Sequence, residues 1–371
     1  MWWLTVLWAC GAPQGADTDD TPGLDSAAAP DVDPVAHVTG NGAYRVGYRS
    51  SEVVYDHPLT GERRLRLALW FPTEAPEPTE TEVSYLGFFP APGVLDDPAP
   101  TPGPHPVIVF SHGHRGFAES LGAVMAQAAR HGWIVAAPDH TGNTSFDSPD
   151  RTTDIYVQRP ADVSATLTHL LDGAEPFLVP NGQAVVAGHS FGGFTALLIA
   201  GAGLDVATWG PLCAQGDTAS VCNGWNDAYT STFAAGFADQ RFQGAVAFAP
   251  GDWRLMQAEG VAATSLPTLH QTGALDPSTP LDGEAIWGSL PAPAWRYDLA
   301  GAGHVGWGDQ AGLPGIDSPG VTLDPQTSQR IGAIGLLALA ETATGRGDAS
   351  ALLDGREPVD DALTTYVHPT P

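Results

Sequence analysis

Short apolar runs that alternate with helical patterns are the feature that most constrains the fold of this chain. A short, mostly apolar run is expected of a strand that is buried on both faces of a sheet. Repeated alternation of such strands with helices is typical of a parallel sheet covered by helices on both faces. We therefore predict an α/β fold with a mostly parallel central sheet. The predicted strands are 106–111, 133–137, 183–188, 244–249, 266–272 and 294–299, and the predicted helices are 118–131, 160–172, 191–200 and 326–344.

The first ten residues, MWWLTVLWAC, form an apolar run that is far too short to span a bilayer. The segment Leu7-Trp8-Ala9-Cys10 resembles the lipobox of bacterial lipoproteins, in which the cysteine becomes the lipidated first residue. We therefore predict a lipoprotein-like signal segment over residues 1–10, with Cys10 as the lipidation site. Another type of export signal, or no signal, remains the alternative. No transmembrane helix is predicted anywhere in the chain.

Residues 11–42 are rich in Ala, Asp, Pro, Gly and Thr and carry few large apolar side chains. Such a segment cannot bury enough apolar surface to fold, which predicts a disordered tether. A tether behind a lipid anchor is typical of an exported protein. We therefore expect a bacterial protein of the cell envelope, either a lipoprotein or a secreted protein.

The folded part of the chain is predicted to be one domain over residues 43–345. Apolar alternation around a turn in 43–56 and 62–71 predicts an antiparallel hairpin. The proline-rich residues 72–105 predict an irregular excursion. The polar residues 346–371 predict a C-terminal tail.

An insertion is predicted over residues 201–241, directly after the helix that follows the third strand. It contains a predicted helix near 227–240 and two cysteines, Cys213 and Cys222. In an exported protein a disulfide that closes this loop is the default expectation. A metal site is not expected there, because no second Cys/His pair with ligand spacing lies nearby.

The charge of the chain excludes several classes of partner. The chain has 15 basic residues, all of them arginine, against 42 acidic residues, and its net charge is −27. Binding of nucleic acid or of anionic lipid needs clustered cations. The charge therefore predicts no nucleic-acid partner, and contact with a membrane only through an N-terminal lipid anchor. A negative field also slows the approach of anionic ligands, which favours neutral or zwitterionic ones.

The segment Gly188-His189-Ser190-Phe191-Gly192 matches the pattern G-x-S-x-G. It lies between a predicted buried strand and a predicted helix, where small residues let the chain turn sharply and expose the serine. The helix that begins after Ser190 points free N–H groups at the same place and favours developing negative charge. We therefore predict that Ser190 is a nucleophile.

The chain resembles α/β-hydrolases, and in particular platelet-activating-factor acetylhydrolases, dienelactone-hydrolase-like esterases and bacterial polyester hydrolases. The resemblance spans roughly residues 43–345 and implies a serine hydrolase fold without implying one substrate. It also implies a lid-like role for the insertion 201–241, because hydrolases of this fold carry lid elements at that position. Dienelactone hydrolases proper use a cysteine nucleophile, so Ser190 disfavours that activity. The matching motifs are Val107-Ile-Val-Phe-Ser-His-Gly113, Arg130-His-Gly-Trp-Ile-Val-Ala-Ala-Pro-Asp-His140, Gly188-His-Ser-Phe-Gly-Gly193, Ala274-Leu-Asp-Pro277 and Gly303-His304.

A serine nucleophile needs a base and an orienting carboxylate, and in this fold the chain order is Ser, acid, His. Asp276 follows the predicted strand 266–272 and is the predicted acid. Asp252 also follows a strand, but one strand earlier, and is the alternative. His304 lies in a glycine-rich loop after the last core strand and is the predicted base.

The oxyanion hole of such a hydrolase is formed by two N–H donors. The residue after the nucleophile, Phe191, supplies the first backbone N–H. The resemblance implies that His114, which follows the His112-Gly113 pair, supplies the second. Neither a metal nor a cofactor is predicted. The candidate pocket residues are aromatic and lie beside the catalytic loops or in the insertion: Phe117, Trp225, Trp253 and Trp307.

Together these motifs predict a serine carboxylic-ester hydrolase that forms an acyl-enzyme on Ser190 and acts on short-chain or lipid-like neutral esters. A polyester hydrolase is the main alternative. A serine peptidase on the same fold and a hydrolase-fold binding protein without activity are further alternatives.

Overall fold

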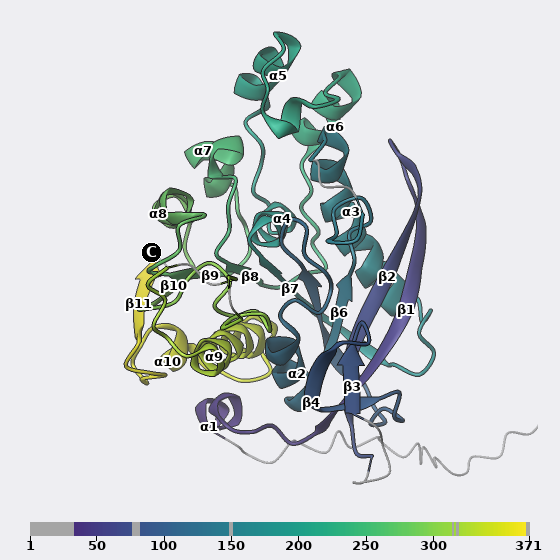
Figure 1. Cartoon of the computed structure of the whole chain (residues 1–371), viewed down its shortest axis with the longest axis vertical. Coiled ribbons are helices and arrows are strands. Elements are labelled where there is room, and N and C mark those ends of the chain that lie inside the picture. Colours follow the sequence, from purple (N-terminus) through teal and green to yellow (C-terminus); the bar gives the residue numbers. More distant parts are fainter. Residues whose placement is uncertain (1–32, 76–81, 148–150, 314, 317–318, 369–371) are drawn as a thin grey trace, which may run out of the picture. The chain divides into compact units, whose positions relative to one another are not determined.

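The computed structural model of the protein describes residues 33–75, 82–147, 151–313, 315–316 and 319–368. The predicted signal segment 1–10, with Cys10, and the predicted tether up to residue 32 lie outside the described residues. The described chain forms a single 11-stranded sheet with helices on its two faces (Figure 1). The predicted α/β fold is therefore confirmed.

The strands of the sheet lie in the order β11-β10-β9-β8-β7-β5-β6-β2-β1-β4-β3. Every pairing from β6 to β10 is parallel. The strands are β1 (Arg45–His57), β2 (Gly61–Thr73), β3 (Glu82–Tyr85), β4 (Phe89–Asp96), β5 (His105–Ser111), β6 (Ile134–Pro138), β7 (Pro180–His189), β8 (Ala245–Phe248), β9 (Thr268–Gly273), β10 (Ala294–Leu299) and β11 (Leu363–His368).

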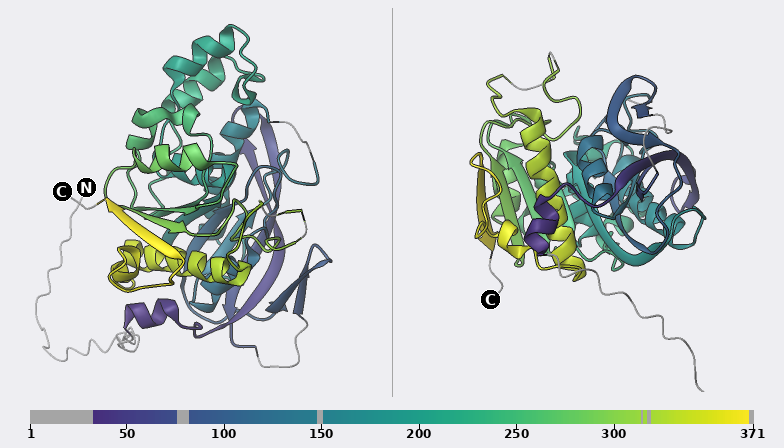
Figure 2. Two further views of the ribbon diagram at one scale, coloured as in Figure 1. Left: turned by 60° about the vertical axis from the view of Figure 1, so that its left-hand side comes forward. Right: turned by 90° about the horizontal axis from the view of Figure 1, so that it is seen from below.

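The helices cover the two faces of this sheet. They are α1 (Pro34–Thr39), α2 (Gly122–Arg130), α3 (Thr153–Leu171), α4 (Phe191–Ile199), α5 (Val206–Ala214), α6 (Asp227–Ala235), α7 (Trp253–Ala262), α8 (Pro280–Trp287), α9 (Pro325–Thr344) and α10 (Ser350–Leu353), with a 3-10 turn, η1 (Ser220–Cys222). Helices α2 and α9 pack against each other on one face, and α1 lies beside α9 (Figure 2). Helices α3 and α4 pack against each other in the layer on the other face.

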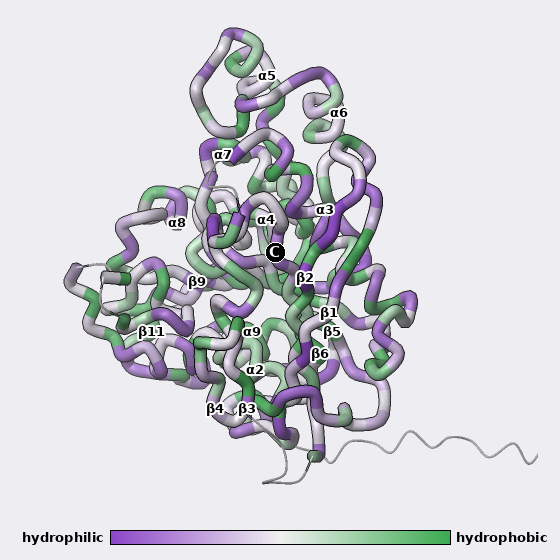
Figure 3. Tube along the Cα trace, turned by 45° about the vertical axis from the view of Figure 1, so that its right-hand side comes forward, coloured by the Kyte–Doolittle hydropathy of each residue, from purple (hydrophilic) through white to green (hydrophobic). Residues whose placement is uncertain are grey.

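The side chains of β5 show why the sheet is covered twice. Ile108 and Phe110 belong to the core beneath α2 and α9, whereas Val107 and Val109 belong to the core beneath α3 and α4. Alternate residues of a strand point to opposite faces, so an unbroken apolar strand needs helices on both sides. Figure 3 shows the hydropathy of each residue along the Cα trace.

The order of the strands in the sheet determines where a functional site can form. β5 lies between β6 and β7, so the chain passes from β6 to β7 across β5. In an open parallel sheet a crevice forms where the strand order reverses, outside the carboxyl ends of the strands. The segments that follow β5 and β7 therefore meet at this crevice.

The predicted hairpin is present as β1 and β2, which pair antiparallel from Arg45↔Thr73 to His57↔Gly61. Gly61 has a φ of 80°, which suits glycine at this turn. The prediction of an irregular excursion over 72–105 is wrong in part. β3 and β4 pair antiparallel within it, and β4 adds to β1, because Val83, Tyr85 and Val94 bury apolar side chains against the core.

The tether predicted over 11–42 does not extend to residue 42. Residues 34–39 form α1, whose first backbone N–H groups are capped by the Asp33 side chain through Val35 N at 3.0 Å. Val38 is 1% exposed and packs in the core shared with α9. One buried side chain and the backbone carbonyl of His37, which lies 3.1 Å from His131 Nε2, therefore fix this helix to the domain.

The prediction of a polar tail over 346–371 is also wrong for the described residues. Leu352 and Leu353 of α10 are buried in the core. β11 then pairs antiparallel with β10, from Leu299↔Leu363 to Ala294↔His368. The Thr-Thr-Tyr-Val sequence of β11 has the β-branched and aromatic composition of a strand, and this local signal is masked by the polar residues that precede it.

The insertion 201–241 contains α5, η1 and α6, at the top of Figure 1. The predicted helix near 227–240 is present as α6. The predicted disulfide between Cys213 and Cys222 is also present and joins α5 to η1. The insertion packs on α3 and α7, with Thr153 N donating to Asn223 O at 2.9 Å and Trp209 Nε1 donating to Arg254 O at 3.1 Å.

Among the residues that the structure describes, no helix has the length and apolar character that a membrane crossing requires.

Candidate active site

Ser190 sits on a sharp turn between β7 and α4. Its backbone has φ 55° and ψ −117°, a conformation that residues with side chains rarely adopt. The turn is possible because glycine flanks it: a Cβ on Gly188 would lie 2.1 Å from Gly192 O, and a Cβ on Gly192 would lie 1.8 Å from Ser111 O. The G-x-S-x-G pattern therefore reflects two close backbone approaches, as the sequence predicts.

The side chain of His304 contacts the serine. His304 lies in the loop after β10, and its Nε2 is 2.9 Å from Ser190 Oγ. Its Nδ1 is 2.8 Å from Asp276 Oδ2 in the loop after β9. The structure thus brings together Ser190, His304 and Asp276 from three loops, in the order that the sequence predicts.

Asp276 is held as an acceptor on several sides. Ser278 N donates to its Oδ1 at 2.6 Å, and Thr279 Oγ1 donates to its Oδ2 at 2.6 Å. Burial by itself would raise the pKa of Asp276, but the bond from His304 and then those from Thr279 and Ser278 hold this pKa at about 2. The carboxylate is therefore ionised at neutral pH and fixes a proton on His304 Nδ1.

The alternative acid, Asp252, has a different partner. It lies just before α7, and both of its carboxylate oxygens accept from Arg151 Nη1, at 3.1 and 2.8 Å. The structure gives it no hydrogen bond to His304 among the described residues. The geometry therefore favours Asp276.

The loop after β5 approaches the serine closely. A Cβ on Gly113 would lie 3.4 Å from Ser190 Cβ. The backbone N–H groups of His114 and Phe191 make no hydrogen bond within the described residues. The two predicted oxyanion donors are therefore unpaired within the described residues and belong to segments that adjoin Ser190.

His189, which precedes the nucleophile, links this turn to the His304 loop. Its Nε2 lies 2.8 Å from the backbone carbonyl of His304, so Nε2 carries the proton and donates. Burial, and then the nearby His304, lower the pKa of His189 to about 3, so the ring stays neutral. No role is predicted from the sequence for His189, which occupies the variable position of the motif.

Arg159 holds the loop after β5 in place through hydrogen bonds. It is fully buried in α3 and donates to the His112 carbonyl, to Ser111 Oγ at 3.1 Å and to Asn143 Oδ1 at 2.8 Å. Asn143 in turn lies 2.8 Å from His114 Nδ1. Neither Arg159 nor Asn143 was identified from the sequence, because their partners are distant along the chain.

A second buried network lies beside the first. Asp162 accepts from Arg63 Nη2 at 2.7 Å and from Tyr55 Oη at 2.6 Å. His140 Nδ1 lies 2.8 Å from the same carboxylate, and His140 Nε2 lies 2.9 Å from Ser111 Oγ. A buried carboxylate is tolerated when its oxygens are satisfied in this way.

Buried neutral histidines make the protein sensitive to acid. Burial lowers the pKa values of His112 and His140 well below their ordinary value and those of His189 and His270 to about 3. Below about pH 6.5 only the unfolded chain protonates these rings, so each should remove about 1.4 kcal/mol of unfolding free energy per pH unit of acidification.

His270 isolates this effect, because neither of its ring nitrogens has a hydrogen-bond partner among the described residues. His270→Leu is expected to make the unfolding free energy less dependent on pH between about pH 6 and pH 4. The slope should decrease by the contribution of one histidine, about 1.4 kcal/mol per pH unit. Denaturant unfolding of both proteins over this range measures the difference. Parallel curves for the two proteins would contradict the prediction.

A cavity of about 200 Å³ opens beside Ser190 and His304. Its apolar wall includes Phe117, Leu121 and Val305. Phe117 is therefore where the sequence predicts it. The insertion 201–241, predicted to be lid-like, contributes no residue to the described wall of this cavity, and its apolar side chains are buried against α3, α4 and α7.

The three tryptophans predicted for the pocket do not line this cavity. Trp307 is 0% exposed and packs on Phe248 and His189, with ring centroids 5.7 and 6.5 Å apart. Trp225 stacks on Phe233 in the insertion at 4.9 Å. Trp253 is partly buried and packs against the apolar core that the insertion shares with α3, α4 and α7. Each of them completes apolar packing, which competes with a pocket role.

A row of phenylalanines runs outward from the cavity. Phe117 stacks on Phe89 at 5.5 Å, and Phe89 contacts Phe88 at 4.4 Å. Phe146 lies 6.3 Å from Phe117. Phe88 and Phe146 are 60% and 62% exposed. Exposed aromatic side chains next to a cavity mark a surface that binds apolar groups.

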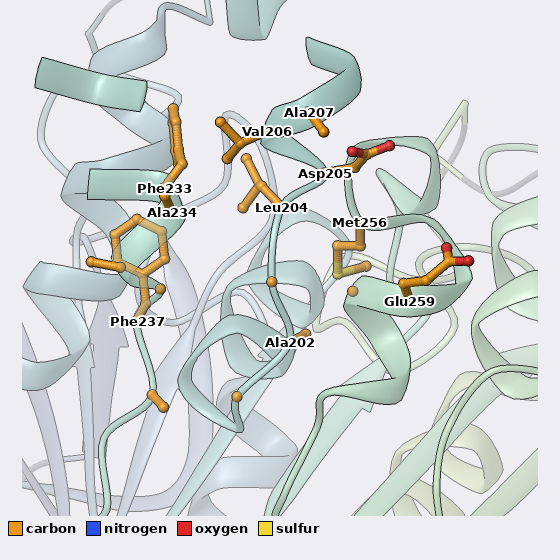
Figure 4. Close-up of a pocket in the computed structure, with 16 residues that line it drawn as sticks. Ala202, Leu204, Asp205, Val206, Ala207, Phe233, Ala234, Phe237, Met256 and Glu259 are labelled. Atoms are coloured by element: carbon orange, nitrogen blue, oxygen red, sulfur yellow. The ribbon is translucent and has the colours of Figure 1, made fainter. Parts of the chain in front are cut away.

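A larger hollow of about 710 Å³ lies between the insertion and α7 (Figure 4). Leu204, Phe233 and Met256 contribute to its wall, together with Glu259. It contains none of the residues around Ser190.

No group of three or more His, Cys, Asp or Glu side chains within the described residues is placed to hold a metal ion.

Comparisons with known proteins agree with this architecture. Residues 108–359 match the family model described as "Alpha/beta hydrolase family". A ferulic acid esterase from Streptomyces cinnamoneus has a similar structure, with a TM-score of 0.59 and 18% sequence identity over 87% of this chain and 96% of that one. At this identity the likeness concerns the fold alone. No curated protein sequence matches the chain. Neither match singles out acetylhydrolases, dienelactone-hydrolase-like esterases or polyester hydrolases.

Proposed function

The chain belongs to the α/β hydrolase family, and from this premise we propose that it is a serine carboxylic-ester hydrolase. The observation that carries the proposal is the unbroken series of contacts from Ser190 Oγ to His304 Nε2, at 2.9 Å, and from His304 Nδ1 to Asp276 Oδ2, at 2.8 Å. A serine hydroxyl becomes a nucleophile when a base takes its proton and a carboxylate orients that base.

In the proposed reaction Ser190 Oγ attacks the ester carbonyl carbon while His304 Nε2 takes the hydroxyl proton. The backbone N–H groups of His114 and Phe191 bind the oxyanion of the tetrahedral intermediate. His304 then gives the proton to the alcohol that leaves, and an acyl-enzyme remains on Ser190. A water molecule, deprotonated by His304, attacks the acyl-enzyme and releases the acid.

His189 and Arg159 support this arrangement without touching the reacting atoms. His189 holds the His304 backbone by one hydrogen bond, and Arg159 holds the His112 carbonyl. Both are buried, so their positions are set by packing as well as by polar contacts. A site fixed in this way keeps its donors aimed at the transition state, which is the main source of electrostatic catalysis.

We propose neutral esters with apolar groups as the substrates, short-chain or lipid-like. The cavity is small, about 200 Å³, and Phe117, Leu121 and Val305 make part of its wall apolar. Carboxylates are disfavoured by the net charge of −27.

The exposed phenylalanines favour a second candidate substrate, an aromatic polyester. Phe88→Ala combined with Phe146→Ala is expected to lower kcat/KM for an extended aryl ester about tenfold, because each aromatic contact contributes about 0.5–1.5 kcal/mol beyond its buried area. The kcat/KM for a short phenyl acetate is expected to change less than about twofold, since that ester ends inside the cavity. Product release from a polyester film gives a further measurement.

Leu281→Ala is the matched control for these variants, because Leu281 is 83% exposed on α8 and lies outside the cavity wall. It should leave all three rates unchanged. An equal loss on the short and the extended esters would contradict a role of the phenylalanines in selectivity.

Covalent labelling tests the proposed function directly. A fluorophosphonate is expected to modify Ser190 and to stop hydrolysis of phenyl acetate. Failure of the wild-type protein to react with the probe and to hydrolyse any ester would refute the proposal. Faster turnover of peptides than of esters would point to the peptidase alternative, and probe binding without any turnover would point to the non-catalytic one.

We also propose export of the protein. The Cys213–Cys222 disulfide suits an oxidising compartment. The lipobox-like sequence that ends at Cys10 is a proposed anchor of the chain to a membrane.

A further inference from the structure

The side chain of His114 stands in the wall of the Ser190 cavity and has one hydrogen-bond partner among the described residues. That partner is Asn143, whose Nδ2 lies 2.8 Å from His114 Nδ1. On its other side, Asn143 Oδ1 lies 2.8 Å from Arg159 Nη1. Asn143 is therefore a bridge between a buried arginine and a histidine of the cavity.

The orientation of this bridge follows from the chemistry of arginine. A guanidinium group has N–H donors and no acceptor, so the atom of Asn143 that faces Arg159 is its carbonyl oxygen. The NH₂ group of Asn143 then faces His114 and donates to Nδ1. A ring nitrogen that accepts a hydrogen bond carries no proton, so the proton of the neutral imidazole is on Nε2.

The surroundings of His114 keep the ring neutral. Burial lowers the pKa of His114, and the positive charges of Arg151, Arg159 and Arg115 lower it further. Its Nε2 makes no hydrogen bond with any described residue. The ring thus offers an uncharged N–H group that is free to bind a ligand.

The same arginine also fixes the backbone of this loop. Arg159 donates to the His112 carbonyl and, at 3.1 Å, to Ser111 Oγ. The backbone N–H of His114, two residues after His112, is one of the two oxyanion donors in the proposed reaction. Arg159 therefore positions a backbone donor and, through Asn143, a side-chain donor of the same residue.

We propose that the imidazole of His114 is a third hydrogen-bond donor to the ester at Ser190, and that Asn143 fixes the tautomer that makes it one. Arg159 acts as a positioning residue by fixing the orientation of Asn143. This inference rests on the proposed ester hydrolysis. It adds a side-chain donor to the two backbone donors and assigns roles to two buried residues.

Asn143→Asp tests the tautomer with almost no change of shape. A carboxylate still accepts from Arg159 but has no N–H for His114, so Nδ1 must become the donor and the neutral ring loses the proton on Nε2. We expect kcat/KM for phenyl acetate in mildly alkaline buffer to fall about tenfold or more. We also expect this loss to shrink toward acidic pH, where His114 becomes charged and Nε2–H returns.

Asn143→Ala is the matched comparison. It leaves the tautomer free, so a donor role predicts a smaller loss than in Asn143→Asp. A merely structural role predicts the opposite order, because Ala removes both hydrogen bonds and leaves a cavity, whereas Asp preserves the shape.

His114→Phe provides a second, independent test. It removes the donor and keeps an aromatic ring, and it is expected to lower kcat/KM about as much as Asn143→Asp. In the His114→Phe background, Asn143→Asp should have no further effect on kcat/KM, since both act through one N–H group. Thermal unfolding and fluorophosphonate labelling establish that each variant is folded and has a reactive Ser190.

Three results would overturn the inference: rates of Asn143→Asp and His114→Phe within about twofold of wild type, a larger loss in Asn143→Ala than in Asn143→Asp, or a further loss when Asn143→Asp is added to His114→Phe. A wild-type protein that hydrolyses no ester refutes the proposed function instead. The two failures are thus distinguishable.

Discussion

Replacement of Ser190 by alanine is expected to lower kcat/KM for phenyl acetate at least about 10⁴-fold, because no other group can then form the acyl-enzyme. The loss should appear in kcat, since the cavity that holds the ester is unchanged. Initial rates with wild type and variant, together with fluorophosphonate labelling of both, provide the measurement. The variant is expected to be folded, because within the described residues the Ser190 hydroxyl has a hydrogen bond only to His304.

Ser120→Ala is the control for this experiment. Ser120 also belongs to the wall of the cavity, but its hydroxyl has no hydrogen-bond partner among the described residues. It is expected to keep most of the activity. Hydrolysis by Ser190→Ala at a rate near that of wild type would mean that another residue is the nucleophile.

Asp276→Asn is expected to lower kcat/KM by about 10⁴-fold while leaving the shape of the site intact. In the wild-type protein Asp276 accepts from His304 Nδ1, which leaves Nε2 free to take the serine proton. The amide group of asparagine can donate to Nδ1 and stabilise the wrong tautomer. Rates measured at saturating and at low ester concentration separate this loss of kcat from a change in binding.

Asp252→Asn distinguishes the two candidate acids. Asp252 pairs with Arg151 and has no contact with His304 in the described structure, so its loss is expected to change kcat/KM less than about tenfold. A larger effect for Asp252→Asn than for Asp276→Asn would reverse the assignment. Because the pKa of Asp276 is about 2, activity is not expected to be limited by protonation of this carboxylate at any pH near neutrality.

The central sheet was predictable because its strands have a strong local signal. Runs such as Val107–Phe110 are apolar throughout, and a strand of this kind is stable only in the middle of a parallel sheet. The edges of the sheet were not predictable in the same way. β3 and β4 have mixed composition, β11 follows a polar segment that masks its strand signal, and all three depend on pairing with other strands of the sheet.

The contacts among Ser190, His304 and Asp276 were predictable for a related reason. Ser190 lies in a turn that requires glycines, and Asp276 and His304 follow strands in a fixed order, so sequence and topology suffice. Contacts across the fold are different. That Arg159 faces Asn143, or that His189 faces the backbone of His304, depends on how helices and loops pack, and one sequence contains no signal for it.

The pocket was the least predictable part. Trp225, Trp253 and Trp307 lie near the site along the chain, but large apolar side chains stabilise a protein most when they are buried, and all three pack against other aromatic or apolar groups. Phe88 and Phe89, which extend from the cavity, come from a segment that is predicted to be irregular, and Phe146 comes from a segment for which no element is predicted.

The pairing of β11 with β10 also matters while the polypeptide is being synthesised. β11 covers one edge of β10, so the backbone groups of β10 on that side stay unpaired until β11 has been synthesised. A chain cut just before β11 would keep Ser190, His304 and Asp276 and the buried residues of α10, yet it would present the open edge of β10 to other molecules. Such a fragment would be prone to self-association through the exposed edge of β10. A low yield of this fragment would therefore reflect the uncovered strand and not damage to the site around Ser190.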